Sequence, residues 1–293
     1  MPHPPVVVPE VGRGREREIG KTLEAMRQAS ECIVANRPDT IIIISPHAPV
    51  LRDQVLIQGA GLLKGDLGRF GARGASVGFD GDVGMARLIC EEARAAGIDA
   101  VAGDASGSRG GGLFSGGGLD HGTVVPLYFI NEALTKSGAA APKLVVISIA
   151  YFDNERLFRF GGCIARAAEK SGSAAALITS GDLSHKLTDD GPYGYDPYGP
   201  EFDRHIVRCI ATRDVRRLLE TDETLLERAA QCGFYGLVML YGALEADRTC
   251  VKTPDSTERA DGVTPDDAGR AVPGRVLSYE GIFGVGYAIA QIL

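Results

Sequence analysis

The chain has 293 residues, of which 44% are hydrophobic and 24% charged, a composition typical of a globular protein with ample core. Its net charge of −7, without a stripe of clustered Lys and Arg, excludes an ordinary nucleic-acid-binding surface. Six scattered cysteines without a CxxC pair exclude a zinc ribbon and a small disulfide scaffold. No apolar run approaches the roughly 20 residues that span a bilayer. We therefore expect one cytoplasmic domain over residues 1–293, without membrane insertion or export.

In chain order, short β-branched runs alternate with long amphipathic segments, which is the rhythm of an α/β fold. The first short run, Val6–Val8, predicts a strand, and residues near 15–36 predict a helix. Ile41–Ile44 is a continuous apolar run of the kind that forms a strand buried on both faces. The alternation continues through predicted strands at 55–58, 144–150 and 174–179 and predicted helices near 81–97 and 154–170.

The last third of the chain follows a different pattern. Helices dominate residues 200–247, and Cys250–Thr253 predicts a short strand before a polar loop over 255–271. The apolar tail at 276–293 predicts a closing hairpin or strand pair.

Two glycine-rich stretches, Gly59–Gly78 and Gly103–Gly118, predict long loops rather than linkers between domains. The sequence contains no repeat of solenoid length. We therefore expect a single α/β domain with a central β-sheet core flanked by helices.

Four of the five histidines lie where a hydrophobic run meets a turn. Open α/β sheets bind their ligands outside the carboxyl ends of the strands, so side chains from distant parts of the chain can meet there. Imidazole binds transition metals and also moves protons near neutral pH. The pattern predicts a metal enzyme whose site contains His3, His47, His121 and His185.

The context of these histidines differs. His47 follows the buried strand directly, within a Ser-Pro-His-Ala-Pro turn. His121 follows an aspartate that can cap a helix, and His185 closes a segment in which Asp182 can orient an imidazole. Each is also compatible with a structural role at a turn or a cap. His205 lies in an amphipathic segment and is interpreted as structural.

Glu280 is the only charged residue between Val276 and Leu293. A carboxylate in apolar surroundings is costly unless a cation, a metal or several donors meet it. Two histidines and one carboxylate form the facial triad of non-haem Fe(II) oxygenases, and the same set binds zinc in hydrolases. We therefore predict His3, His47 and Glu280 as metal ligands, with iron and zinc both open at this point.

Five short motifs contain these residues: His3-Pro4-Pro5, Ser45-Pro46-His47-Ala48-Pro49, Leu119-Asp120-His121-Gly122-Thr123, Ser180-Gly181-Asp182-Leu183-Ser184-His185 and Ser278-Tyr279-Glu280-Gly281. In order and spacing they resemble the class III extradiol ring-cleavage dioxygenases, the LigB family. The resemblance spans almost the whole chain and is greatest to the LigB-like branch associated with AMMECR-type domains, which is related to the Memo proteins. It implies a LigB-like, phosphorylase-like layered architecture.

The resemblance also implies an activity, namely cleavage of a catechol-type aromatic ring with O₂ by a non-haem Fe(II) enzyme. It implies that His3, His47 and Glu280 bind Fe(II), that His185 is the catalytic acid/base and that His121 faces the substrate. Zinc or copper in place of iron, a homo-oligomer and an AMMECR-type partner are all compatible with it.

The main alternative is a Memo-like protein that binds a metal and acts through a partner, without ring cleavage. Cys232-Gly233 resembles the Cys-Gly segment of Memo proteins, whose cysteine takes part in the metal site, although a buried structural thiol is the simpler interpretation. A zinc hydrolase is a third hypothesis for the function. Tyr193, Tyr195 and Tyr198 receive no role, because a Pro/Gly loop that packs its own tyrosines accounts for them equally well.

Overall fold

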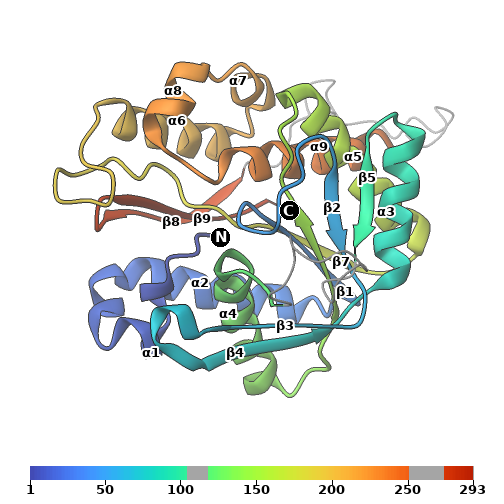
Figure 1. Cartoon of the computed structure of the whole chain (residues 1–293), viewed down its shortest axis with the longest axis horizontal. Helices are drawn as coiled ribbons and strands as arrows, with labels where there is room; N and C mark the ends of the chain where they lie inside the picture. The colour runs from blue at the N-terminus through green and yellow to red at the C-terminus, as the bar shows by residue number, and fades with distance from the viewer. Residues whose placement is uncertain (104–117, 251–273, 293) are drawn as a thin grey trace, which may run out of the picture.

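The central sheet of the computed structural model contains, among the described residues, five strands in the order β5-β2-β6-β1-β7 (Figure 1). The structure describes residues 1–103, 118–250 and 274–292. Strands β6, β1 and β7 run parallel, whereas β2 is antiparallel to β6 and parallel to β5. The strands are β1 (Thr40–Ser45), β2 (Val55–Gln58), β5 (Ala100–Gly103), β6 (Lys143–Ser148) and β7 (Ala175–Thr179).

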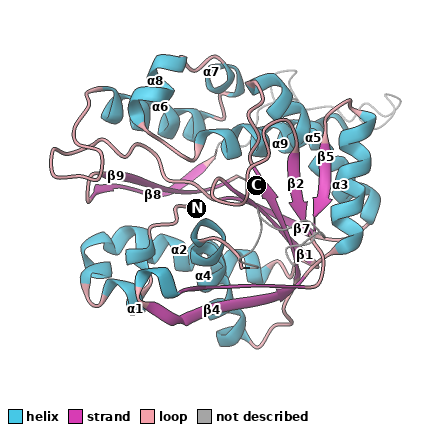
Figure 2. Ribbon diagram, in the orientation of Figure 1, coloured by secondary structure: helices cyan, strands magenta, loops and turns pink. Residues whose placement is uncertain are grey.

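Helices cover both faces of this sheet (Figure 2). Along β1, Ile41 and Ile43 pack into one core and Ile42 and Ile44 into the other, as the two-residue period of a strand requires. The first core is covered by α2 (Gly20–Ala35) and α4 (His121–Ser137), and the second by α3 (Val83–Ala95), α5 (Asn154–Ser171) and α9 (Phe234–Cys250). The predicted α/β class, a central sheet flanked by helices, is confirmed.

The C-terminal part also follows the prediction. Residues 200–247 are mainly helical, and the apolar tail forms a two-stranded hairpin. The elements there are α6 (Tyr198–Thr212), α7 (Val215–Leu219), α8 (Glu223–Ala229), α9, β8 (Arg275–Ile282) and β9 (Val285–Gln291). Cys250 is the last residue of α9 rather than the start of a strand. The predicted continuation of that strand to Thr253, the polar loop at 255–271 and most of the second glycine-rich stretch lie outside the described residues.

The predicted strand at Val6–Val8 is wrong. Pro5–Val7 forms a 3₁₀ helix, η1, and Pro9–Gly12 forms the short helix α1. Proline lacks the N–H that a strand ladder needs, and its fixed φ suits the first position of a helix, where Pro5 and Pro9 both lie. Helix η2 (Arg15–Ile19) then leads into α2.

The predicted loop over Gly59–Gly78 is also wrong, because this segment forms most of the hairpin β3 (Leu62–Leu67) and β4 (Ala72–Asp80) around η3 (Gly68–Phe70). Buried and exposed positions alternate along most of β4, but many of its residues are small, so the alternation is not visible in the sequence as a hydrophobic pattern. Gly65 serves packing rather than flexibility: a Cβ there would lie 2.8 Å from side-chain atoms of Leu119 and Val124.

The site predicted from the histidines lies where β1, β7, α4 and the N-terminal segment meet, near the centre of Figure 1. The backbone N–H of Ser180, just beyond β7, donates to the Ile44 carbonyl of β1, and that of Gly181 donates to the carbonyl of Met1. No helix of the described ranges is long and apolar enough to cross a membrane. Five cysteines of the described part of the chain are free thiols: Cys32, Cys90, Cys163, Cys209 and Cys232.

Candidate metal centre

His47 lies two residues beyond β1, in a turn that is tied to the start of α4. The Ser45 hydroxyl donates to Asp120 Oδ1 over 2.7 Å and accepts the backbone N–H of His47 over 3.3 Å. Asp120 is the N-cap of α4, and its Oδ1 accepts the backbone N–H of Thr123 over 3.1 Å. One carboxylate therefore fixes both the strand end that carries His47 and the helix that begins at His121.

His3 is held by the segment after β7 and is only 2% exposed. Its backbone N–H donates to Asp182 Oδ1 over 2.9 Å, and its Nδ1 lies 2.8 Å from the Ser180 hydroxyl oxygen. That hydroxyl donates its own proton to the carbonyl of Gly122 over 2.5 Å, so it accepts the proton of His3 Nδ1. His3 therefore carries its proton on Nδ1 and presents the lone pair of Nε2.

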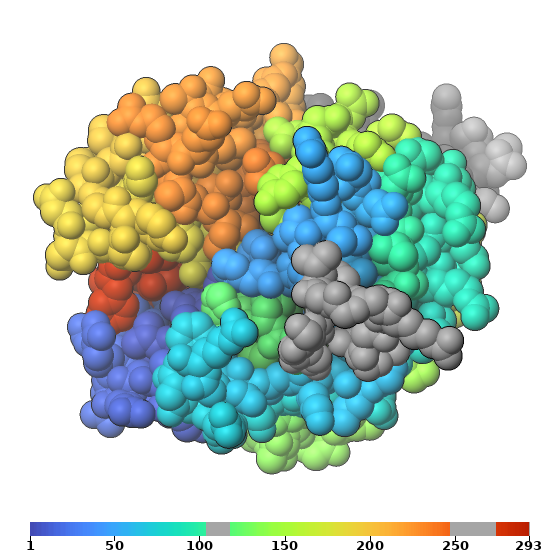
Figure 3. Space-filling model, viewed as in Figure 1, coloured from blue at the N-terminus to red at the C-terminus, as the bar shows by residue number. Residues whose placement is uncertain are grey.

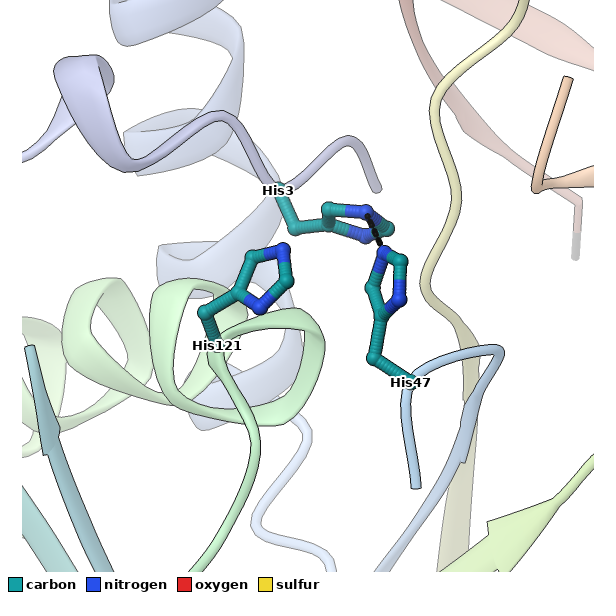
Figure 4. A group of neighbouring side chains, drawn as sticks. All are labelled: His3, His47 and His121. Carbon is teal, nitrogen blue, oxygen red and sulfur yellow. Dashed lines mark hydrogen bonds between the residues drawn. The ribbon is translucent and has the colours of Figure 1, made fainter. Parts of the chain in front are cut away.

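The imidazole rings of His3, His47 and His121 converge at this place (Figure 4). His3 Nε2 lies 3.1 Å from His47 Nε2, and the His121 ring stacks on that of His47 with centroids 4.3 Å apart. One ligand atom from each ring lies within 4.8 Å of the other two. Metal–nitrogen bonds of about 2.0–2.1 Å place two nitrogens about 2.9 Å apart at a right angle and about 3.4 Å apart at the tetrahedral angle. The distance between the two Nε2 atoms therefore suits a shared cation.

Burial favours the neutral form of two of these rings, those of His3 and His121. Burial, followed by the charges of His47 and His121, lowers the pKa of His3 well below its ordinary value. Burial, and then the charge of His47, also lowers the pKa of His121. Neutral imidazole is the form that binds a metal, so both rings are available as ligands at neutral pH.

A second group of ligand atoms adjoins the first and consists of His3, Asp182 and Cys232. Cys232 Sγ lies 3.6 Å from His3 Nε2 and accepts the backbone N–H of Asp182 over 3.2 Å. Burial, reinforced by the charge of Asp182, raises the pKa of the Cys232 thiol. Burial likewise raises the pKa of Asp182, against the hydrogen bond from the His3 backbone. The two segments approach this closely because Gly181 lies against Gly233: a Cβ on Gly181 would lie 2.2 Å from the Cα of Gly233.

His185 lies half-buried beside these groups, in the segment after β7. Its backbone N–H donates to the carbonyl of Ala229 over 3.1 Å. Its Nδ1 is buried, and none of the residues that the structure describes gives that atom a hydrogen-bond partner. Its ring is edge-on to Tyr193, with centroids 5.7 Å apart. A buried ring nitrogen without a partner is costly, and a turn of the imidazole that brings this nitrogen to the surface would allow a bound molecule to supply the hydrogen bond.

Glu280 lies on β8, where it contacts the first turn of α2. Its Oε2 accepts hydrogen bonds from the backbone N–H and from the hydroxyl of Thr22, each over 2.7 Å. These donors, at a helix N-terminus, supply the partners that a carboxylate in apolar surroundings needs. The structure brings His3, His47 and His121 together but places Glu280 in neither group of ligand atoms. Its role as a metal ligand stays a prediction.

Two further site residues have no counterpart in the sequence prediction. Ser180 sets the tautomer of His3, and Ser45 joins the His47 turn to the cap of α4. Ser45 ends β1 and Ser180 directly follows β7, so a polar residue at the end of each buried strand was the available signal.

Comparison with known proteins defines the family. Residues 1–289 match the model described as "Catalytic LigB subunit of aromatic ring-opening dioxygenase". The chain therefore belongs to the LigB family.

Two curated relatives show how far the likeness extends. Protein CA_C1420 of Clostridium acetobutylicum is 33% identical over 294 aligned residues, which cover 100% of this chain and 56% of that protein. The 3,4-dihydroxyphenylacetate 2,3-dioxygenase of Escherichia coli is 27% identical over 187 residues, 60% of this chain and 62% of that enzyme. The chain thus spans little more than half the length of the curated relatives that it matches.

A solved structure agrees on the architecture. The crystal structure of uncharacterized protein JW3007 from Escherichia coli K12 superposes with a TM-score of 0.54 over 91% of this chain and 92% of that one. At 14% sequence identity this likeness concerns the fold alone.

Proposed function

We propose that the protein is a non-haem Fe(II)-dependent extradiol dioxygenase that cleaves a catechol-type ring with O₂. The observation that carries the proposal is the 3.1 Å distance between the Nε2 atoms of His3 and His47. The hydrogen bond to Ser180 keeps the proton of His3 on Nδ1, so its Nε2 lone pair is free to bind a metal. Membership of the LigB family supports the reaction class. The relative named for 3,4-dihydroxyphenylacetate supports a dihydroxylated aromatic substrate.

His3 and His47 would hold the metal in this proposal. Glu280 is the third ligand that the family resemblance implies, whereas the group of ligand atoms formed by His3, His47 and His121 supports His121 for that place. Glu280 would need to exchange two hydrogen bonds from Thr22 for the metal. When bound, iron would supply the redox chemistry toward O₂, and the protein groups would supply orientation and proton control.

His185 would act as the acid/base. Its Nδ1 is buried and lacks a partner among the described residues, so the imidazole would turn to bring this nitrogen to a substrate hydroxyl. An imidazole in this position can take the hydroxyl proton and return it later in the reaction.

The test is anaerobic reconstitution with Fe(II), followed by measurement of O₂ uptake and of ring-fission absorbance with a panel of catechols. We expect His185→Ala to retain iron and to lose roughly 10²- to 10⁴-fold in turnover. His47→Ala should lose iron. His205→Ala is the matched control, since His205, on α6, bonds to Thr221, two residues beyond the end of α7, rather than to the site. Iron binding without O₂ uptake for any catechol would refute the proposal.

The third ligand is tested by comparing two variants for iron stoichiometry. If His121 completes the set, His121→Ala loses iron and Glu280→Gln keeps it. If Glu280 completes the set, the opposite holds, and the structure must then release Glu280 from Thr22 on loading.

A metal-binding function without turnover is the second candidate, and the observation that favours it is the 3.6 Å approach of Cys232 Sγ to His3 Nε2. Thiolate favours softer cations such as Cu(I) and Zn(II). This candidate predicts that Cys232→Ala weakens zinc or copper binding, whereas the dioxygenase proposal predicts that the same variant retains Fe(II).

We extend the proposal to a cytoplasmic location. We also extend it to self-association and to an AMMECR-type partner, and sedimentation with and without such a partner tests these two.

A further inference from the structure

Two exposed aromatic side chains lie against the histidines of the candidate site. The ring centroid of Phe70 is 5.3 Å from that of His121, and that of Tyr193 is 5.7 Å from that of His185. Phe70 is 41% exposed and Tyr193 64%. Among the exposed large hydrophobic side chains of the described ranges, only these two have a ring contact with a histidine of the site. Aromatic side chains next to a few converging polar groups are typical of a ligand-binding site.

The two rings come from separate parts of the fold. Phe70 ends η3 in the β3–β4 hairpin, and Tyr193 lies in the segment between β7 and α6. In Figure 1 these segments lie below and above the N-terminus, respectively. In Figure 3 the yellow part of the chain lies above and the cyan part below, and the red hairpin β8–β9 is visible at the left, between the yellow part and the blue N-terminal part.

The segment that carries Tyr193 is anchored on both sides of it. The backbone N–H of Leu187 donates to the carbonyl of Gly284 over 3.0 Å, and that of Asp196 donates to the carbonyl of Lys186 over 3.1 Å. Arg228 adds a 3.0 Å hydrogen bond to the Asp196 carboxylate. These bonds close the segment into a loop with a fixed base, so the Tyr193 ring is presented to His185 at little further cost in chain entropy.

The neighbouring tyrosines have other surroundings. The Tyr198 ring is covered by the Arg228 guanidinium, 4.1 Å from its centroid. Tyr195 is 53% exposed and has no ring contact within the described part of the chain. Tyr193 is thus the tyrosine of this loop that the structure connects with the site, and Tyr195 is its natural control.

We propose that Phe70 and Tyr193 contact the aromatic ring of the substrate from two sides and thereby determine which ring substituents the site accepts. The inference rests on the proposed function, because it assigns the ring of a catechol to the space next to His121 and His185. Offset or edge-to-face contact between rings favours a flat aromatic substrate over a saturated diol of the same size. Substituents that project toward either ring would be discriminated by size.

The absence of tryptophan from the chain allows a direct binding test. Phe70→Trp and Tyr193→Trp each introduce a single indole, and its emission is followed as protocatechuate is added anaerobically to metal-free and to Fe(II)-loaded protein. Cyclohexane-1,2-diol is the saturated comparison, and Tyr195→Trp is the control variant. We expect saturable changes in emission with protocatechuate for the first two variants, and none for the control variant or with the saturated diol.

Truncation gives the second measurement, by calorimetric titration of the same probes. Phe70→Leu and Tyr193→Leu should each raise the Kd for protocatechuate about three- to tenfold at unchanged iron content. Tyr193→Phe should bind as the parent does, because it keeps the ring, and Tyr195→Leu should have no effect. Parent-like binding by both leucine variants would overturn the inference and leave the proposed function standing. Binding without O₂ uptake would overturn the function alone, and failure of the parent to bind any catechol would overturn both.

Discussion

The proton on His3 Nδ1 is fixed by the Ser180 hydroxyl, directly after the end of β7, rather than by a carboxylate. Ser180 donates to Gly122 and must therefore accept from His3. The direction of one serine hydroxyl thus decides which ring nitrogen of His3 carries the proton and which presents a lone pair toward His47. Outer partners of this kind hold a ligand ring in one tautomer and one orientation. The Ser180 side chain is consequently part of the proposed metal site although it offers no ligand of its own.

We predict that Ser180→Ala weakens metal binding roughly 10- to 100-fold, because His3 loses the acceptor that orients it. Isothermal titration with Zn(II) or anaerobic Fe(II) measures the change. Ser30→Ala is the matched control: Ser30 is equally buried, and its hydroxyl has no hydrogen-bond partner among the described residues. Equal metal affinity for both variants would show that Ser180 does not orient His3.

The ionisation of Asp203 should make the free energy of unfolding depend on pH. Burial raises the pKa of Asp203 to about 6, although the Ser184 N–H and the Tyr279 hydroxyl act in the opposite direction. Between the unfolded value of about 4 and this folded value, the folded chain binds more protons, so the free energy of unfolding decreases as the pH rises from about 4 to 6 and is then constant. Asp203→Asn should lack this slope and gain on the order of 2 kcal/mol relative to the parent between pH 4 and 7.

The measurement is urea unfolding of parent and variant at several pH values. Asp196→Asn is a control of opposite sign, because the Tyr198 N–H and then Arg228 lower the pKa of Asp196, and its ionised form stabilises the fold above its unfolded pKa. Parallel pH profiles for Asp203→Asn and the parent would contradict the prediction.

At the scale of elements, the helices and strands that could be predicted are those with a strong local sequence pattern. Strand β1 was evident because Ile41–Ile44 has no polar interruption, and the cap of α4 because Asp120 precedes the helix. The β3–β4 hairpin was missed because its glycines also favour loops, and its register depends on contacts with α4, distant in sequence. His47 and His185 could be predicted because each follows a buried strand, whereas the Glu280–Thr22 contact joins residues 258 positions apart and left no local signal.

The contact between α5 and α9 depends on glycine. A Cβ on Gly161 would lie 1.9 Å from the carbonyl oxygen of Met239, so Gly161→Ala must push the helices apart, at a cost of about 2 kcal/mol or more. The next residue, Gly162, is the control, since its nearest neighbour is the flexible Arg166 side chain at 3.2 Å. Gly162→Ala should be neutral or stabilise by up to about 1 kcal/mol through helix propensity. Urea unfolding distinguishes the two, and similar effects would contradict this account of the packing.

At the scale of the whole molecule, the histidine cluster joins segments that are distant in the sequence. His3, His47 and His121 belong to the N-terminal segment, the end of β1 and the start of α4. An unfolded chain cannot hold these side chains together, so a cation bound by them stabilises the folded state by mass action.

Thermal unfolding should report this linkage. At a metal concentration 100-fold above Kd we expect a gain of about 2.7 kcal/mol in the free energy of unfolding. His47→Ala should abolish the gain, whereas His205→Ala should retain it even if its own stability is lower. An undiminished gain in His47→Ala would mean that the metal binds elsewhere.

The contact of Gly181 with Gly233 has a consequence for how this site can change over evolution. With no side chain on either residue, two loops that lie 52 positions apart meet backbone to backbone, and this meeting sets the spacing between Asp182 and Cys232. A replacement at Gly181 would separate the loops and draw the sulfur away from His3, and a Cβ on Gly233, 3.0 Å from the Asp182 carbonyl oxygen, would press on the same contact. Lineages that keep the thiol in place should therefore keep both glycines together, while lineages that abandon it are released from both constraints at once.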